Sequence, residues 1–322
     1  HHPLSMPNKS SKGSVKKKAY AYLGPVGTFT ELALAQVPEA KGQVWMPVSH
    51  VQEAIDLVIS KQAFRAIVPV ENSIEGGVSA TLDALAATET IRIYGEYLVN
   101  VKFDLVARPG IKLTDVRTVA THPVAYAQTR KWLGDNLPNH HHLPTTSTAA
   151  AAAELLKSDI AQAAVAASTI TDHYKLRVLA KNIGDNKNAQ TRFIQIGLAG
   201  ALAERTGRDK TSVIVELPTD RPGALLEMLE QFAARGVNLS RIESRPIGDR
   251  LGRYRFNIDV QGHIDEDAVA ESLKGLHRFS PKVSFLGSYA RADKEKSIHE
   301  GNNSNSEFAL ADDWLKKLKS AR

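Results

Sequence analysis

Apolar and polar positions alternate in two ways along the first two thirds of the chain. Short apolar runs predict strands at 19–23, 44–48, 66–70, 117–120, 163–167 and 191–196. Helical spacing between them predicts helices that include 50–61, 124–133 and 148–157. This succession is typical of parallel sheets covered by helices. The segment 91–107 has long β-like runs without a helix, which suggests a crossing between two lobes.

Several predicted strands end in small polar or glycine-bearing turns that could cap a helix. Thr28 to Glu31 has the spacing of a capping box, and Ser147-Thr148 precedes an alanine-rich helix. His122 comes directly before a proline at a predicted first helical position. Each turn alone is explained by ordinary capping. Their repetition at strand carboxyl ends, where open α/β sheets bind ligands, favours a cleft for an anionic ligand.

From Thr211 onward the pattern predicts a separate βαββαβ unit. The elements are a strand at 211–217, a helix from about Asp220 to Gly236, strands at 237–247 and 253–261, a helix at 267–278 and a strand at 282–287. We expect Leu225, Leu226, Leu229 and Phe232 on the apolar side of the first helix. The order is that of a ferredoxin-like module, and residues 198–210 are the predicted linker to it.

Charge and cysteine content narrow the class of protein. Of the net charge of +6, five lysines lie within residues 1–18, and residues 19–290 are close to neutral. A basic face for nucleic acid is therefore not expected on the folded body. No apolar run approaches the roughly 20 residues that cross a bilayer, so no membrane association is expected. The chain has no cysteine, which fits a cytoplasmic protein.

The two ends of the chain are expected to lie outside the folded domains. Residues 1–18 are a basic, tag-like tail that we expect to be disordered, and residues 291–322 are a polar tail. An apolar stripe of Leu310, Trp314, Leu315 and Leu318 predicts an amphipathic helix near its end. We favour a solvated or body-docked helix, with a membrane-surface or partner helix as the alternative.

Four short motifs occur in an order that one family shares. They are Gly24-Pro25-Val26-Gly27-Thr28-Phe29, the run from Glu71 to Val78, Thr191-Arg192-Phe193 and Glu243-Ser244-Arg245-Pro246. In this order they resemble the prephenate dehydratases, and the region that follows Asp220 resembles an ACT domain. The resemblance covers about residues 19–290.

The resemblance implies an α/β fold in two parts. A two-lobed catalytic unit, similar to type II periplasmic binding proteins, would span 19–197, with lobe 1 at about 19–97 and 187–197 and lobe 2 at about 98–186. A ferredoxin-like ACT regulatory domain would span 211–290. Subunits of such a protein are expected to form a homodimer or homotetramer.

The implied reaction is the decarboxylating dehydration of prephenate to phenylpyruvate in phenylalanine biosynthesis, with no metal or cofactor. Thr191 would donate a proton or hydrogen bond to the departing hydroxyl, and Arg192 would bind a carboxylate or organise the site. Glu71 and His122 are further catalytic candidates. The implied substrate contacts are Thr28, Asn72, Ser73, Gly76, Gly77, Ser147, Thr148 and Phe193. A structural role competes for each, and for Phe193 a core position is favoured.

The ACT resemblance implies phenylalanine as an allosteric ligand. Its contacts would be Gly223, Ala224, Leu225, Asn238, Leu239 and Ser240, with Glu243, Ser244, Arg245 and Pro246 supporting the site or its transmission. Two other functions stay open, an arogenate dehydratase and a non-catalytic amino-acid sensor. The run His140-His141-His142 is not expected to bind metal, because adjacent residues on an extended segment diverge.

Overall fold

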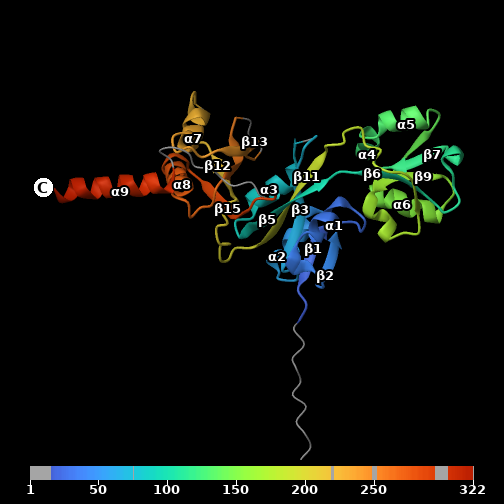
Figure 1. The fold of residues 1–322 in the computed structure, drawn as a ribbon, viewed down its shortest axis with the longest axis horizontal. Coiled ribbons are helices and arrows are strands. Elements are labelled where there is room, and N and C mark those ends of the chain that lie inside the picture. Colours follow the sequence, from blue (N-terminus) through green and yellow to red (C-terminus); the bar gives the residue numbers. More distant parts are fainter. Residues whose placement is uncertain (1–15, 75, 219–220, 249–251, 294–303, 322) are drawn as a thin grey trace, which may run out of the picture.

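The computed structural model describes residues 16–74, 76–218, 221–248, 252–293 and 304–321. They form three units in a row, each built on its own sheet, with a helix extending from the last unit (Figure 1). Three predicted features fall wholly or partly outside the described residues. They are the turn expected at 248–252, the helix start expected at Asp220, and Glu75 of the second motif.

The first unit is a mixed sheet with strand order β2-β1-β3-β11-β5, and β4 pairs with β3. Its strands are β1 (Ala19–Leu23), β2 (Val44–Val48), β3 (Arg65–Asn72), β4 (Gly76–Gly77), β5 (Ile91–Asn100) and β11 (Gln190–Leu198). Its helices are α1 (Phe29–Ala35), the 3-10 helix η1 (Pro38–Ala40), α2 (Val51–Ile59) and α3 (Ser79–Ala87). β1, β2 and β3 are parallel, whereas β11 runs antiparallel to both β3 and β5.

The second unit has strand order β10-β6-β9-β7-β8. Its strands are β6 (Phe103–Ala107), β7 (Thr118–Thr121), β8 (His141–Pro144), β9 (Ala163–Ala167) and β10 (Arg177–Ala180). Its helices are α4 (Pro123–Ala127), α5 (Arg130–Asn136) and α6 (Thr148–Lys157), with 3-10 helices η2 (Leu113–Asp115) and η3 (Ser168–Asp172). The single helix expected at 124–133 is thus two short ones, α4 and α5.

The chain crosses between these units twice, at neighbouring places. It leaves after β5, which ends at Asn100, and it returns before β11, which starts at Gln190. The two crossings are joined by a backbone hydrogen bond of 2.8 Å from the Val101 amide to the Ala189 carbonyl. Two lobes joined by paired strands are the architecture of type II periplasmic binding proteins, so the expected fold class is confirmed.

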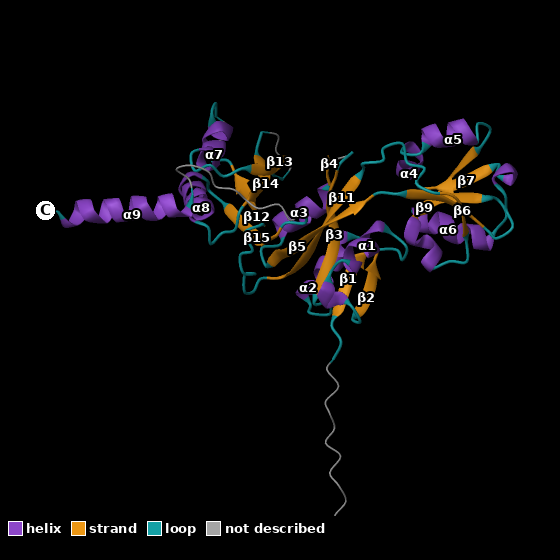
Figure 2. Ribbon diagram, in the orientation of Figure 1, coloured by secondary structure: helices purple, strands orange, loops and turns teal. Residues whose placement is uncertain are grey.

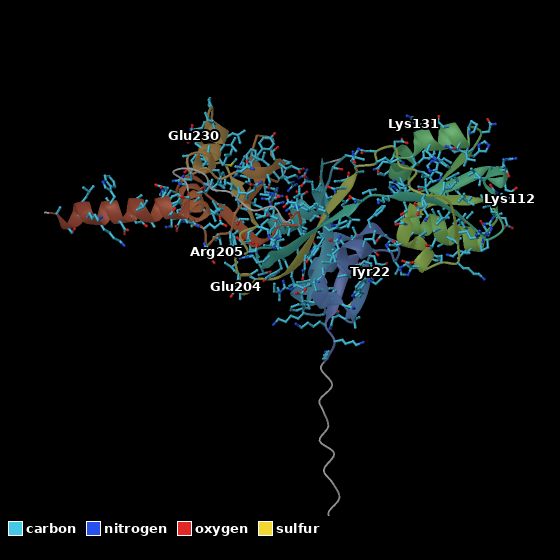
Figure 3. The ribbon with its side chains drawn as sticks, viewed as in Figure 1. Tyr22, Lys112, Lys131, Glu204, Arg205 and Glu230 are labelled. Carbon is cyan, nitrogen blue, oxygen red and sulfur yellow. The ribbon has the colours of Figure 1, made fainter. Side chains whose placement is uncertain are left out.

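The third unit is a four-stranded antiparallel sheet of order β13-β14-β12-β15, covered by two helices (Figure 2). Its strands are β12 (Asp209–Glu216), β13 (Leu239–Pro246), β14 (Tyr254–Gln261) and β15 (Val283–Ala290). Its helices are α7 (Ala224–Ala233) and α8 (Asp267–Phe279), and α9 (Asn305–Ser320) follows. The observed order βαββαβ confirms the ferredoxin-like module. In Figure 3, Tyr22 marks the first lobe, Lys112 and Lys131 the second, and Glu230 this third unit.

The expected apolar side of α7 is confirmed for Phe232 and Leu229, which pack in the core of the third unit, but it was wrong for Leu225 and Leu226. The row Ala224, Met228 and Phe232 packs onto the sheet, and these residues are 2%, 0% and 0% exposed. Leu225 and Leu226 are exposed. Residues four positions apart lie on the same side of a helix. Because Ala224, Met228 and Phe232 face the strands, the leucines next to Ala224 in the sequence face away from them.

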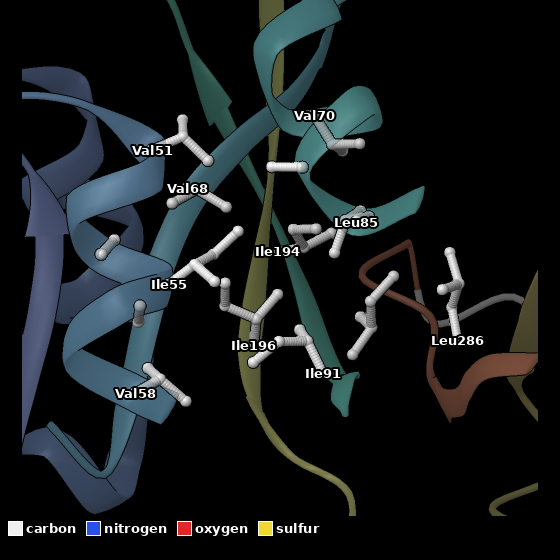
Figure 4. Packing of buried hydrophobic residues seen from close by; sticks show 14 of the residues in the cluster. Val51, Ile55, Val58, Val68, Val70, Leu85, Ile91, Ile194, Ile196 and Leu286 are labelled. Atoms are coloured by element: carbon white, nitrogen blue, oxygen red, sulfur yellow. The ribbon is translucent and has the colours of Figure 1, made fainter. Parts of the chain in front are cut away.

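One hydrophobic core is shared by the first lobe and the third unit. Ile214, Leu286 and Tyr289 of the third unit belong to the same buried cluster as residues of α2, α3, β3, β5 and β11, and Figure 4 shows Leu286 at the edge of this cluster, on the side of the third unit. A Cβ at Gly287 would come within 2.4 Å of the Ile93 carbonyl oxygen, so β15 and β5 approach closely. The two units are therefore packed as one body at this boundary.

Candidate functional site

Thr191 lies at the start of β11, directly after the second crossing, and is 9% exposed. Its Oγ1 accepts a 3.0 Å hydrogen bond from Nδ2 of Asn72 at the end of β3. Oδ1 of Asn72 accepts from the Ile74 amide, which fixes the orientation of the carboxamide. A hydroxyl has one hydrogen to donate and accepts through its lone pairs. The Asn72 carboxamide therefore occupies one acceptor position of the Thr191 hydroxyl. The hydrogen of that hydroxyl remains available for a different acceptor.

Ser73 ties the second motif to the same strand. Its Oγ accepts a 2.9 Å hydrogen bond from the Gln190 amide, and its own amide donates to the Gln190 carbonyl. The structure thus brings Asn72, Ser73 and Thr191 together, although 119 positions separate Asn72 from Thr191. The antiparallel pairing of β3 and β11 creates this meeting, which no local sequence pattern reveals.

Thr28 is the N-cap of α1, but its side chain makes no capping hydrogen bond. Its Oγ1 makes a long contact of 3.4 Å with the Leu23 carbonyl. The expected capping box is not formed, because the Thr28 side chain does not cap the helix and the Glu31 carboxylate accepts from the Gly27 amide rather than from Thr28. The other oxygen of Glu31 contacts Nε2 of His173 in the second lobe at 2.5 Å. Glu31 therefore bridges the two lobes.

His122 and Ser147 follow neighbouring strands of the second lobe. Nδ1 of His122 accepts from the Val124 amide, so this ring caps α4. Oγ of Ser147 accepts from the Ala150 amide and caps α6, of which Thr148 is the first residue. The parallel strands β7, β8 and β9 end at one edge, and η3, which follows β9, meets the first lobe at Gly27. These turns therefore lie at the edge of the second lobe that faces the first.

Arg192 points to the opposite side of β11 from Thr191, because successive residues of a strand face opposite ways. Its guanidinium is 7% exposed and donates to Oδ2 of Asp259 at 2.6 Å and to the Tyr289 hydroxyl at 2.7 Å, both in the third unit. It also contacts Glu96 of β5 at 3.2 Å and Glu71 at 3.5 Å. We call Arg192, Glu71, Glu96, Asp259 and Tyr289 the boundary cluster.

Electrostatics in the boundary cluster favour charged groups despite burial. Burial alone would raise the pKa of the Asp259 carboxyl, but the charges of Arg192 and Arg241 outweigh it and hold that pKa below its usual value. Burial would likewise lower the pKa of Arg192, yet Asp259, Tyr289 and Glu96 raise it well above normal. Burial raises the pKa of Tyr289, so its phenol stays protonated; its oxygen accepts from Arg192, and it shares a hydrogen bond with the Ser212 hydroxyl.

The fourth motif faces the second motif across the same boundary. A Cβ on Gly77 would lie 1.9 Å from Oε2 of Glu243, so this glycine admits the Glu243 side chain. Arg245 forms a bidentate pair with Asp83 of α3, at 2.7 and 3.0 Å. Arg241 adds contacts of 3.3 Å to Glu71 and 2.7 Å to Glu243. Strand β13 is thereby docked on the hairpin and helix that follow Asn72.

Phe193 and the glycines complete the candidate set. The Phe193 ring is 2% exposed within a core cluster that includes Tyr20 and Ile67. Gly76 has a φ of +80°, a conformation that favours glycine, and the space beside its Cβ position is open. The residues of the third unit from Gly223 to Leu225 and from Asn238 to Ser240 lie at the start of α7 and around the start of β13.

Sequence reasoning did not find Glu96, Asp259, Tyr289 or Asp83. Asp259 had a visible signal, since it is an acidic residue inside an otherwise apolar strand pattern, where an unpaired carboxylate would be costly. Asp83 and Glu96 carried none. The rings of His140 and His142 contact Tyr126, by a 2.9 Å hydrogen bond and by stacking at 3.9 Å, which gives this run a structural role.

The fold and site define a two-lobed α/β enzyme with a ferredoxin-like regulatory domain. Residues 20–200 match the family model of prephenate dehydratase, and residues 211–278 match that of the ACT domain. The chain belongs to the prephenate dehydratase family. A prephenate dehydratase of Mycobacterium marinum is 43% identical over 277 residues, which are 84% of this chain and 87% of that one.

Two solved structures extend the comparison. The prephenate dehydratase of Arthrobacter aurescens, described in complex with L-Phe, is 51% identical, with a TM-score of 0.89 over 94% of this chain and 100% of that one. GqqA, described as a novel type of quorum quenching acylase, is 28% identical, with a TM-score of 0.76 over 85% of this chain and 97% of that one. Within the described residues, no helix has the length and apolarity needed to cross a membrane.

Proposed function

We propose that this protein converts prephenate to phenylpyruvate, with Thr191 as the donor to the departing ring hydroxyl. The observation that carries the proposal is the hydrogen bond from Asn72 Nδ2 to Thr191 Oγ1. Accepting this bond makes the threonine O–H a better donor, because linked hydrogen bonds polarise one another. The side chain is nearly excluded from water, where such a donor stabilises developing charge most strongly.

In this reaction the bond between the ring and its carboxylate breaks, and carbon dioxide leaves. The bonding electrons move into the ring, which becomes aromatic, and the hydroxyl on the opposite ring carbon leaves with a proton as water. Aromaticity supplies the driving force. The protein then has two tasks, to hold a dianion in the reactive geometry and to stabilise the leaving oxygen.

For the dianion we propose groups from both lobes. Ser73 and Thr28 would contribute from the first lobe, and Ser147, Thr148 and the first-turn amides of α6 from the second. Helix amino termini bind carboxylates through free N–H groups, and α6 is ten residues long. Gly76 would allow close backbone approach of the substrate. His122, as a helix cap, would orient the turn at the end of β7.

The remaining candidates are given supporting roles. We propose that Arg192 organises the site from the other side of β11 and that Glu71 does so through its contacts with Arg192 and Arg241. Gly77 would serve the approach of Glu243, and Phe193 would position β11 from the core. These roles follow from the contacts that each side chain makes, and none requires contact with substrate.

An acylase activity is less well supported by this site. A hydroxyl nucleophile of an acyl-transfer enzyme needs a partner that accepts its proton. The partner of Thr191 is a carboxamide nitrogen, which donates instead. The geometry therefore favours the role of a hydrogen-bond donor over that of a nucleophile.

We predict that the purified protein turns over prephenate faster than arogenate, without added metal or cofactor. The two compounds differ by an amino group in place of the keto oxygen, so the assay compares kcat/KM for phenylpyruvate formation with that for phenylalanine formation. Faster turnover of arogenate would assign the chain to that reaction. Turnover of neither, combined with tight binding of phenylalanine, would support the non-catalytic sensor.

We further propose that phenylalanine is an allosteric inhibitor that binds the third unit. The contacts would be Gly223, Ala224 and Leu225 with Asn238, Leu239 and Ser240, at the exposed end of α7. The effect of phenylalanine binding would be transmitted through β13, which is docked on Gly77 and Asp83. The transmitting residues would be Glu243, Ser244, Arg245 and Pro246. The ligand would thus act on the hairpin that carries Asn72.

Replacing Asp83 with asparagine should weaken this transmission. The hydrogen bond from Arg245 contributes most to lowering the pKa of the Asp83 carboxyl, and Arg255 also pairs with it at 3.2 Å. At neutral pH the variant therefore loses the charged pairs with Arg245 and Arg255 and retains its volume. We expect basal turnover close to the unaltered protein and a half-inhibiting phenylalanine concentration raised by about fivefold or more, within the usual range of allosteric coupling. Asp56→Asn, on the exposed surface of α2, is the matched control. Unchanged inhibition in Asp83→Asn would remove this residue from the pathway.

The assembly and location belong to the same proposal. We expect a homodimer or homotetramer, in which the open end of α7, with its exposed Leu225 and Leu226, is covered by another subunit. A cysteine-free chain suits the reducing cytoplasm, where we expect the enzyme to act. Sedimentation across a concentration series measures the first expectation directly.

A further inference from the structure

Helix α9 carries a large apolar surface that faces solvent. Leu310, Trp314, Leu315 and Leu318 are 59%, 63%, 45% and 52% exposed. The helix is attached to the third unit near its first turn, where Phe308 packs against the core and Oδ1 of Asn305 accepts from the Asp267 amide at 3.2 Å. Beyond this it extends away from the body (Figure 1).

The exposed apolar side chains lie on one side of the helix. With about 100° of rotation per residue, Leu310, Trp314, Leu315 and Leu318 fall within one arc, and Lys316 lies opposite. A helix of sixteen residues is only marginally stable in water without a packing partner. The length and capping of α9, with Ser304 accepting from the Glu307 amide, therefore suit a helix whose apolar side is covered.

Charges along the two edges of the apolar side specify what could cover it. Asp313 and Lys317 lie along one edge, and Asp312 and Lys319 along the other. In an antiparallel pair of identical helices, each edge meets the same edge of its partner. When the pair is centred near Leu315, Asp313 faces Lys317 of the partner and Asp312 faces Lys319.

A parallel pair would have the opposite result. Each edge would then meet the other edge at the same height, so that Asp313 would face Asp312 and Lys317 would face Lys319. Like charges at these positions disfavour pairing. The sequence of α9 is thus self-complementary in one orientation only.

We propose that α9 pairs with α9 of a second copy of this chain, antiparallel and about a two-fold axis near Leu315. This contact is isologous, as most contacts between identical subunits are. The body is attached at the first turn of each helix, so the two bodies lie at opposite ends of the pair. Two single helices bury less than a standard interface, so we expect weak, concentration-dependent pairing in addition to any contact of the third unit.

Charge reversal in the full chain tests the pairing by sedimentation. Two double variants, Asp312→Lys/Asp313→Lys and Lys317→Asp/Lys319→Glu, place like charges opposite each other in the pair. Each should lose the oligomer that forms through α9 pairing, which sediments fastest in the unaltered protein. A chain with all four changes should regain it, as should a mixture of the two variants. Lys316→Glu, on the side away from the apolar face, is the matched control and should change nothing. Equal assembly of all variants would overturn the proposal.

Single cysteines test the orientation, because the chain has none of its own. Leu315→Cys should form a disulfide-linked dimer under mild oxidation. Leu310→Cys should not link to itself, but it should link to Ala321→Cys when the two variants are mixed. Self-linking of Leu310→Cys would show a parallel pair and overturn the proposal. If none of the expected disulfide links formed and the full chain bound anionic lipid vesicles, the proposal would also be overturned. That result would assign α9 to a membrane surface.

Discussion

Replacing Thr191 with alanine is expected to lower kcat for phenylpyruvate formation by at least about a hundredfold. One preorganised donor to a developing oxyanion contributes roughly 3 kcal/mol to the transition state, which corresponds to this factor. The change removes the hydroxyl that Asn72 orients and leaves a small cavity on a strand that stays paired on both sides. Initial rates at saturating prephenate measure the effect, and unfolding by urea confirms that the variant is folded.

Two companion variants make this result specific. Thr191→Ser keeps the hydroxyl and should retain most of the turnover, although the smaller side chain is less well fixed. Asn72→Asp replaces the donor to Thr191 with an acceptor, so the threonine hydrogen would turn toward the carboxylate and away from substrate. We expect a loss in kcat with little change in KM. Normal turnover in Thr191→Ala would remove this residue from the chemistry.

Replacing Arg192 with methionine is expected to destabilise the protein by about 3–5 kcal/mol, the usual effect of removing one partner from a buried ion cluster. Asp259 and Glu96 would be left buried with fewer partners, although Lys210 still contacts Glu96 at 2.7 Å. The free energy of unfolding in urea measures the change. Lys282→Met, which removes an exposed ion pair at the same boundary, is the control and should change stability little.

The pH dependence of this variant has a definite sign. In the unaltered protein the lowered pKa of Asp259 contributes stability above the unfolded pKa, which is lost as the pH falls through the folded pKa. Replacing Arg192 removes the strongest of the groups that lower the pKa of Asp259, while burial still raises this pKa and Arg241, Ser212 and Lys210 remain, so the pKa should rise. The folded variant then binds a proton more readily than the unaltered folded protein does, so the loss of stability should be largest at neutral pH and smaller in acid. A loss that is independent of pH would contradict this account.

Strand and helix positions could be predicted closely, because period and turn residues are local properties. The strands expected at 19–23, 44–48 and 163–167 match β1, β2 and β9 residue for residue. The helix α3 was missed, since its alanine-rich sequence has no sharp apolar side, and the break between α4 and α5 was not visible in a continuous helical pattern. Local sequence patterns therefore predicted the order of most helices and strands, but they did not reveal every helix or every break within a helix.

The site was less predictable, because it depends on which face of a strand a residue occupies. Thr191 and Arg192 are neighbours in sequence, and both were expected near the substrate. The pairing of β11 between β3 and β5 turns Thr191 toward Asn72 and Arg192 toward Asp259 and Tyr289. Asp259 lies 67 positions further along the chain. The partners of Arg192 are determined by how the third unit docks on β11, and the short motifs do not specify that docking.

The shared boundary between the first lobe and the third unit bears on how an inhibitor-resistant enzyme could be engineered. Deleting the chain after residue 200 would uncover Ile91 and Ile93 and would strip Arg192 of Asp259 and Tyr289 in one step. A truncated catalytic fragment would therefore be prone to aggregate instead of working free of feedback. Point changes at the rim of this boundary, such as those at Asp83, leave the buried contacts intact and are the better route to sustained production.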